Sequence, residues 1–205
     1  MENEPAKRPL RIGITGGIGS GKTTACRVFA TLGIPVYYAD DRAKWLMEHD
    51  AALVAALQAE FGASIYDQEG RLQRPRLAEL VFNDKARLEK LNALVHPVVR
   101  EDGLRWDEHH RTTPYTLREA ALLYESGIYR LLDKIITVTA PEPLRIERVQ
   151  ARDGLSAEQI KARMDKQWPE AEKVERADFV IHNDGRRSLL RQVYAIHHQI
   201  IAATV

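Results

Sequence analysis

A glycine-rich segment followed by lysine and threonine is the part of the sequence best suited to chemistry. Residues 16–23 are G-G-I-G-S-G-K-T and satisfy the pattern G-x-x-x-x-G-K-[ST], in which backbone N–H groups surround a phosphate. Glycines let the backbone approach an anion without Cβ clashes, and the start of a following helix favours negative charge. In such loops the lysine bridges the β- and γ-phosphates and the hydroxyl residue holds Mg²⁺. The segment therefore predicts a nucleoside polyphosphate site.

Lys22 is accordingly expected to stabilise the transferred phosphate, and Thr23 is the expected Mg²⁺ ligand. The other residues expected to contact the nucleotide belong to the same loop and the first helical turn: Gly17, Gly19, Ser20, Gly21 and Thr24.

Asp40 follows a short β-rich run at residues 34–39. Because ligands gather at the carboxyl ends of parallel strands, its carboxylate could orient an acceptor hydroxyl and take its proton. The alternative is that Asp40 caps a helix beginning near Arg42, and Asp41 competes for either role. Spacing alone leaves the two interpretations even.

Three arginines, Arg145, Arg148 and Arg152, occur at i, i+3 and i+7 and so share one face of a helix. Guanidinium groups on a mobile lid would stabilise the transferred charge and exclude water. The alternative, a solvated face paired with Glu142 and Glu147, is favoured by spacing alone.

Glu125 is expected to close the third strand, where it would assist the metal or bind the acceptor. An ordinary exposed glutamate at a strand end is an equal alternative. The single Cys26 excludes an intramolecular disulfide and is interpreted as a packing residue.

Short apolar runs alternate with helical periodicity along the chain, which predicts an α/β fold. Strands are expected at residues 10–15, 34–39, 115–123, 134–140 and 177–182. Helices are expected at 23–32, 51–61, 84–110 and 186–203, with a charged helical stretch at 142–176. A strand, helix, strand opening requires a parallel sheet covered by helices. Pro97 is expected to kink or interrupt its helix.

The roughly seventy residues between the second and third strands far exceed a crossover, so they predict an inserted helical lobe. The formal net charge of +1 provides no global field for nucleic acid or membranes. Residues 1–10 lack the apolar run of a signal peptide. We therefore expect a cytoplasmic enzyme with no nucleic-acid, membrane or obligatory protein partner.

The ordered segments together resemble the dephospho-CoA kinase family. The resemblance rests on T-G-G-I-G-S-G-K-T from Thr15, A-D at 39–40, N-A-L-V-H-P from Asn92, L-L-Y-E from Leu122, R-V-Q-A-R-D from Arg148, the Gln167 region and A-D-F-V-I-H-N-D-G from Ala177. It implies ATP-dependent phosphorylation of the ribose 3′-hydroxyl of dephospho-CoA, giving coenzyme A and ADP. It also implies a P-loop fold like that of nucleoside monophosphate kinases, with a five-stranded parallel sheet, flanking helices, an inserted substrate lobe and a helical lid.

The same resemblance implies that Asp40 is the catalytic aspartate, that Arg148 and Arg152 are lid residues near the phosphates, and that Asn183 lies near the adenine. The expected parts are a tail (1–10), a nucleotide-binding core (11–41, 112–141, 177–205), a lobe for the acceptor (42–111) and a lid (142–176). Departures from the family's usual residues at Tyr38, Ala121 and Tyr124 remove no group that this chemistry needs.

Two other functions share part of this sequence pattern. A kinase for a nucleoside monophosphate or a sugar acid would share the loop and lid, and the acceptor lobe decides against it only by resemblance. A nucleotide-gated switch is disfavoured because the sequence lacks an N-K-x-D motif and a strand ending in D-x-x-G.

Overall fold

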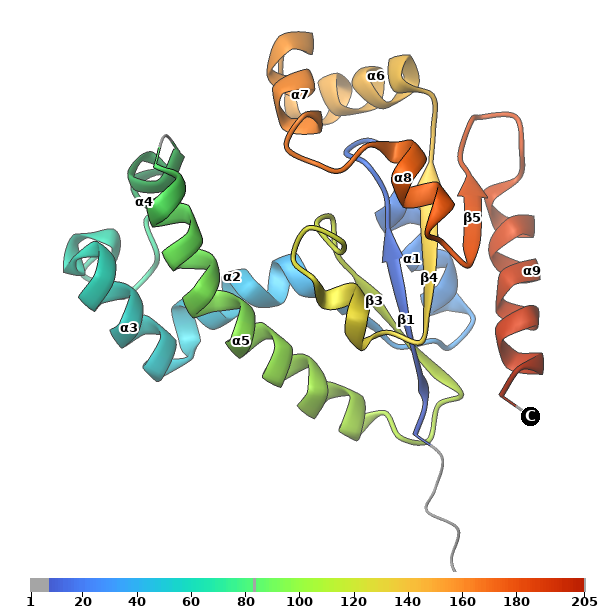
Figure 1. Ribbon diagram of the computed structural model, residues 1–205, viewed down its shortest axis with the longest axis horizontal. Coiled ribbons are helices and arrows are strands. Elements are labelled where there is room, and N and C mark those ends of the chain that lie inside the picture. Colours follow the sequence, from blue (N-terminus) through green and yellow to red (C-terminus); the bar gives the residue numbers. More distant parts are fainter. Residues whose placement is uncertain (1–7, 83, 205) are drawn as a thin grey trace, which may run out of the picture. The chain divides into compact units, whose positions relative to one another are not determined.

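A parallel sheet organises the chain in the computed structural model, which describes residues 8–82 and 84–204 (Figure 1). Its five strands are β1 (Leu10–Thr15), β2 (Val36–Tyr38), β3 (Tyr115–Glu119), β4 (Lys134–Thr139) and β5 (Phe179–His182). They lie in the order β2-β3-β1-β4-β5, and each neighbouring pair is parallel. The predicted α/β fold with a five-stranded parallel sheet is confirmed.

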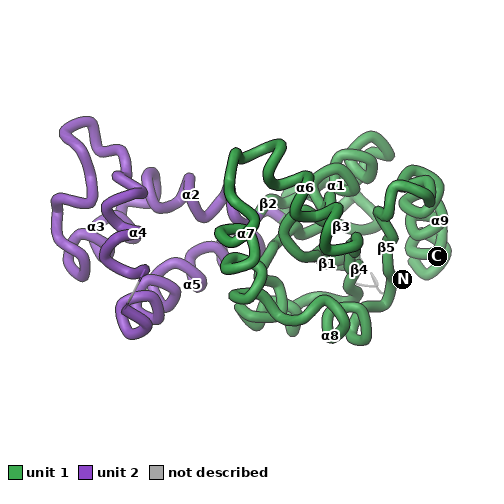
Figure 2. The backbone as a smooth tube through the Cα atoms, turned by 90° about the horizontal axis from the view of Figure 1, so that it is seen from above, with its two compact units in different colours: residues 1–38, 107–205 green, residues 39–106 purple. Residues whose placement is uncertain are grey.

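The helices divide between two compact units, drawn in different colours in Figure 2. The first unit, residues 1–38 and 107–205, holds the sheet with α1 (Lys22–Thr31), α6 (Glu142–Asp153), α7 (Ala157–Met164), α8 (Glu170–Glu175), α9 (Leu189–Ala202) and the 3-10 turn η2 (Ile128–Leu131). The second, residues 39–106, holds α2 (Ala39–His49), α3 (Ala51–Phe61), η1 (Ala63–Ile65), α4 (Arg74–Phe82) and most of α5 (Lys85–His109). No helix in the described ranges is both long and apolar enough to cross a membrane.

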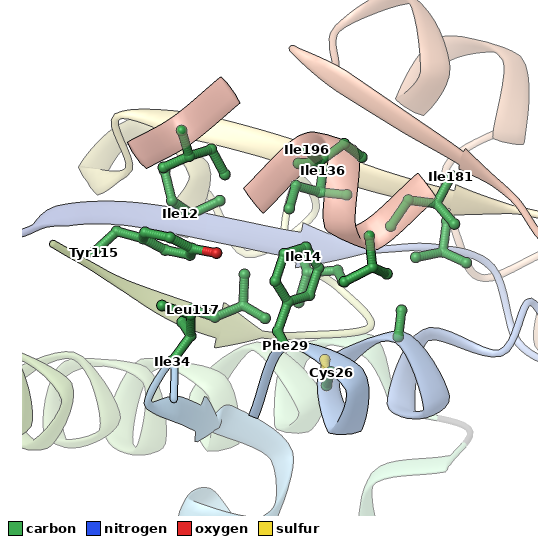
Figure 3. Packing of buried hydrophobic residues seen from close by; sticks show 14 residues of the cluster. Ile12, Ile14, Cys26, Phe29, Ile34, Tyr115, Leu117, Ile136, Ile181 and Ile196 are labelled. Atoms are coloured by element: carbon green, nitrogen blue, oxygen red, sulfur yellow. The ribbon is translucent and has the colours of Figure 1, made fainter. Parts of the chain in front are cut away.

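The core of the first unit lies between the sheet and the helices α1 and α9 (Figure 3). The central strand contributes Ile12 and Ile14, both fully buried, as expected for a strand with both faces covered. Phe29 of α1 and Ile196 of α9 pack into the same cluster. Cys26 belongs to it as well, which confirms its interpretation as a packing residue.

The second strand is shorter than expected, and this changes the setting of Asp40. Residues Val36–Tyr38 form β2, and helix α2 begins at once with Ala39. Asp40 and Asp41 therefore lie inside the first helical turn, where the helix dipole favours carboxylates. The helix expected near Arg42 begins three residues earlier, so Asp40 is not the residue that precedes and caps it.

The third strand also ends early, which corrects the placement of Glu125. The chain leaves the sheet after Glu119, and the next bond to β1, from Ala120 N–H to the carbonyl of Ile14, is followed by local turns. One such turn is closed by Ser126 N–H on the carbonyl of Leu122, 3.0 Å apart. The apolar residues after Glu119 have the sequence character of a strand, but they are apolar because most of them are buried in turns and not because they pair in the sheet. Glu119, and not Glu125, closes β3.

Helix α5 continues without a break through Pro97, so of the two expected effects, a kink or an interruption, the interruption is wrong. A proline removes one intrahelical bond, and burial on either side can compensate for it. Val95 and Val99 provide that burial, with 7% and 6% of their surfaces exposed.

Candidate active site

The glycine-rich segment forms a loop between the carboxyl end of β1 and the start of α1. Gly21 precedes the helix in a left-handed conformation with φ of 88°, and Gly19 has φ of 79°. The loop is tightened by a bond of 3.0 Å from Ser20 N–H to the carbonyl of Gly17. Because the residue before the helix has no side chain, it cannot cap the first turn, which suits a helix start that receives an anion.

Close packing around the loop is a second reason, besides the approach of a phosphate, why glycine is required at its positions. A Cβ atom at Gly19 would collide with the backbone of Arg145 in α6. A Cβ atom at Gly21 would collide with the side-chain amide of Asn183. The loop is therefore shaped by segments that are more than a hundred residues away in the sequence.

Lys22 begins α1, and its ammonium group is ion-paired with the carboxylate of Glu119. Both side chains are largely buried, with 12% and 7% exposed. Glu119 lies opposite Ile14 in the parallel register of β1 and β3, so its side chain is fixed at the end of the sheet beside the loop. Glu119 was not among the predicted site residues, because the apolar pattern of the sequence continues four residues past the end of β3.

Thr23 and Thr24 lie in the first turn of α1, and both are exposed. The N–H of Thr24 bonds the carbonyl of Gly21 at 3.0 Å and so closes the turn. The Thr23 hydroxyl and the Glu119 carboxylate are hard oxygen donors of the kind Mg²⁺ prefers. This donor set, with the glycine cradle beside it, fits a nucleotide polyphosphate with its magnesium ion.

The three arginines of α6 have different surroundings. Arg145 is buried, and its Nε donates to the carbonyl of Ile18 in the loop at 2.9 Å. Arg148 donates to the carbonyls of Gly19 at 3.5 Å and Asn183 at 3.1 Å. Arg152 is 64% exposed and pairs with its neighbour Asp153 at 2.7 Å. The structure thus brings two arginines to the loop and leaves the third at the surface.

Asn183 follows the last strand and contacts both the loop and Arg148 of α6. Its backbone N–H bonds the carbonyl of Thr139 at 2.8 Å, which extends the β4–β5 pairing by one residue. Its side-chain Nδ2 donates to the carbonyl of Ser20 at 2.8 Å. Three site residues predicted from the sequence therefore lie in contact in the structure: Arg148, Asn183 and Ser20.

Glu125 does not end a strand; its carboxylate binds Trp168 and the buried Lys173. One carboxylate oxygen accepts from the N–H of Trp168 at 2.7 Å and lies 3.0 Å from Nζ of Lys173. Lys173 is fully buried, and Trp168 stacks on Tyr124 with ring centroids 5.5 Å apart. These contacts hold the turn that follows β3 against the segment that leads into α8.

Asp40 belongs to the second unit, two residues beyond the end of β2, and it is exposed. Its neighbour Asp41 pairs with Lys44 at 2.7 Å. Two residues after Asp40, Arg42 makes two bonds to Asp102 of α5, at 2.9 and 2.6 Å. This bidentate pair fixes the first turn of α2, which carries Asp40, to α5.

Comparison with known proteins gives a consistent result. Residues 10–188 match the family model described as Dephospho-CoA kinase. The dephospho-CoA kinase of Chlorobaculum tepidum is 41% identical over 92% of this chain and 95% of the relative, and that of Porphyromonas gingivalis is 42% identical over 91% and 92%. The crystal structure of TT1252 from Thermus thermophilus superposes with a TM-score of 0.83 at 38% identity, covering 94% of this chain and 98% of that one. The dephospho-CoA kinase of Campylobacter jejuni gives a TM-score of 0.70 at 28% identity, covering 95% and 98%.

Proposed function

The chain belongs to the dephospho-CoA kinase family and is an ATP-dependent kinase of dephospho-CoA; on this premise we propose the roles of its individual residues. The product of the reaction is coenzyme A, formed when the ribose 3′-hydroxyl receives the γ-phosphate. The single observation that carries the assignment of roles is the loop of left-handed glycines that ends at Lys22, which is paired with Glu119.

Lys22 and the backbone of the loop bind the phosphates of ATP. The glycines expose N–H groups at the start of α1, where the helix dipole favours negative charge. Lys22 exchanges its contact with Glu119 for the β- and γ-phosphates when the nucleotide arrives. The ammonium then offsets the charge that develops on the transferred group.

Thr23 would hold Mg²⁺ through its hydroxyl, and the carboxylate of Glu119, which is ion-paired with Lys22, would offer a second oxygen donor. When bound, the ion would neutralise charge on the phosphate oxygens. Thr24 supports the turn through its backbone bond to Gly21.

Asp40 positions the acceptor hydroxyl and accepts its proton. Its place in the first turn of α2, directly after the carboxyl end of β2, is the kind of position at which acceptor-binding groups of parallel sheets occur. Its exposure leaves the carboxylate accessible to a substrate. In-line transfer then needs only that the hydroxyl oxygen be held near the γ-phosphorus.

Arg148 and Arg152 act from α6. Arg148 already contacts the loop, so a small movement of its guanidinium would bring it to a phosphate. Arg152 needs a larger rearrangement, in which it leaves Asp153 for the nucleotide when the lid closes. Asn183 lines the nucleotide site beside Ser20, on the side where we propose the adenine. The enzyme would work in the cytoplasm on small molecules.

The direct test is incubation with Mg-ATP and dephospho-CoA, with a nucleoside monophosphate and gluconate as parallel acceptors, and identification of the products by mass. Coenzyme A in the first reaction only is the expected result. Transfer to another acceptor alone would retain the fold and discard the substrate. Release of ADP without any phosphorylated acceptor would instead indicate a nucleotide-gated switch.

A further inference from the structure

Ile18, near the middle of the phosphate loop, has both of its backbone groups bound by side chains that come from distant parts of the chain. Its N–H donates to Oε1 of Gln167 at 2.9 Å, and its carbonyl accepts from Nε of Arg145 at 2.9 Å. Loop peptides usually satisfy such groups with water or with their own backbone. Here two side chains fix two adjoining peptide groups, Gly17–Ile18 and Ile18–Gly19, which are together called the Ile18 peptide.

Arg145 is committed to this contact by its surroundings. A second nitrogen of its guanidinium bonds Glu170 at 2.8 Å, and the other carboxylate oxygen of Glu170 is bonded to the Thr139 hydroxyl at the end of β4. Only 7% of the Arg145 surface is exposed. A Cβ atom at Gly17 would collide with the guanidinium itself, so the loop lies directly against it.

The side chain of Gln167 is also fixed by contacts with other segments. Its Nε2 reaches the carbonyl of Ala121 at 3.4 Å, so one amide joins the turn after β3 to the phosphate loop. The next residue, Trp168, donates its N–H to Glu125, and the buried Lys173 pairs with the same carboxylate. The position of Gln167 is therefore set by packed neighbours and not by its own flexibility.

We propose that Arg145 and Gln167, supported by Glu170, are positioning residues that set the Ile18 peptide and thereby aim the N–H groups of the loop at the nucleotide phosphates. Neither side chain is needed as a ligand of the phosphates. This inference rests on the proposed function, because it assigns the loop to ATP. Its consequence is that the two side chains act on adjoining peptide groups of one residue, Ile18, so that losing both costs less than the product of the separate losses.

The test compares Gln167→Met with Gln159→Met. Gln159 lies in the neighbouring helix α7 and belongs to a capping box with Ser156, so its loss affects local stability without touching the loop. We expect Gln167→Met to raise the KM for ATP and the Kd for ADP about 5- to 10-fold, the effect of one lost hydrogen bond to a partly buried group. The KM for dephospho-CoA should stay within about twofold, and Gln159→Met should leave all three constants unchanged.

Arg145→Met, alone and combined with Gln167→Met, completes a double-mutant cycle on ADP affinity. Losses that are clearly smaller in combination than their product support action on one shared peptide. Multiplicative losses, or a Gln167→Met enzyme that matches Gln159→Met, would overturn the proposal. If Arg145→Met does not fold, Gln167→Met alone decides. Because ADP binding is measured by calorimetry on the whole chain, failure of wild-type turnover with dephospho-CoA would count against the proposed acceptor and not against this inference.

Discussion

The ammonium of Lys22 and the carboxylate of Glu119 form a buried ion pair that links the first turn of α1 to the last residue of β3. Because Lys22 directly follows the glycine-rich loop, nucleotide phosphates bound there would compete with Glu119 for its ammonium group. We expect the pair to open when ATP binds, because the phosphates would attract the ammonium away from the carboxylate.

Neutralising Glu119 should therefore make stability depend more strongly on nucleotide. We expect Glu119→Gln to lower the free energy of unfolding by up to about 3 kcal/mol, because a buried lysine loses its charged partner. ADP without metal should then raise the melting temperature more in this variant than in the wild type, because the phosphates replace the missing charge. Differential scanning calorimetry measures both effects.

The matched control is Asp107→Asn, which breaks buried ion pairs with Arg11 and Arg118 that include no residue of the loop. It should lose stability without any larger response to ADP. Equal shifts of the melting temperature in wild type and Glu119→Gln would contradict the exchange of partners.

Asp40→Asn should lower kcat by about 10²- to 10⁴-fold while leaving ADP affinity unchanged, because the amide cannot accept the hydroxyl proton. Asp41→Asn is the control, since Asp41 lies in the same turn but is 73% exposed and paired with Lys44. Steady-state rates at saturating substrates decide the matter. A kcat within about threefold of wild type for Asp40→Asn would remove Asp40 as the base.

Gly21→Ala and Gly33→Ala separate backbone strain from close packing. Both glycines are left-handed, with φ of 88° and 81°, so alanine should cost each about 1 kcal/mol of stability. An added Cβ meets Asn183 at position 21 and nothing within 4 Å at position 33. Only Gly21→Ala should raise the KM for ATP, and it should do so by more than about tenfold. The same KM in both variants would show that the packing of the loop does not matter for binding.

Arg152→Ala tests the lid. Because the side chain is 64% exposed and pairs only with adjacent Asp153 in the described contacts, its loss should change stability by less than about 0.5 kcal/mol. A fall in kcat of about tenfold or more is expected if the guanidinium reaches the nucleotide in the closed state. Arg111→Ala provides a control on another exposed arginine, which precedes β3 and pairs with Glu108. Parallel kinetics for the two variants would exclude Arg152 from the site.

Burial raises the pKa of the Cys26 thiol from 9.0 to about 12, although Lys22 acts in the opposite direction. The folded protein therefore favours the neutral thiol, and the stability that this provides is complete below pH 9.0 and lost as the pH rises toward 12. We expect the free energy of unfolding of wild type to fall with pH above 9 by up to about 1.4 kcal/mol per unit more than that of Cys26→Ala. Urea titrations from pH 8 to 11 measure the difference, and parallel curves would contradict the buried thiol.

Local patterns were sufficient for much of the architecture. The spacing of apolar residues placed β1 at Leu10–Thr15 and α3 at Ala51–Phe61, and the order of strands and helices required a parallel sheet. The phosphate loop could be found because its chemistry depends on adjacent residues. Such features follow from backbone geometry and periodicity, which act over a few residues.

The same local patterns did not predict where β2 and β3 end. Leu123 is fully buried although it lies in a turn, so its apolar character did not report strand pairing. Because the apolar pattern continues past Glu119, it predicts a strand end at Glu125 and does not distinguish Glu119, the partner of Lys22. Burial and extension give the same sequence signal, and only the hydrogen-bonded partner distinguishes them.

The sequence by itself determined the parallel α/β fold, the phosphate loop and, through resemblance, the family of kinases. The tertiary structure alone decided that Glu119 pairs with Lys22 and that Arg145 and Gln167 share the Ile18 peptide. Spacing along a helix placed Arg145, Arg148 and Arg152 on one face, but the partners of Arg145 and Arg148 come from α8, the residue after β5 and the loop itself. The physical reason is that side-chain contacts depend on distances in space between segments far apart in the chain, whereas a motif is written in consecutive residues.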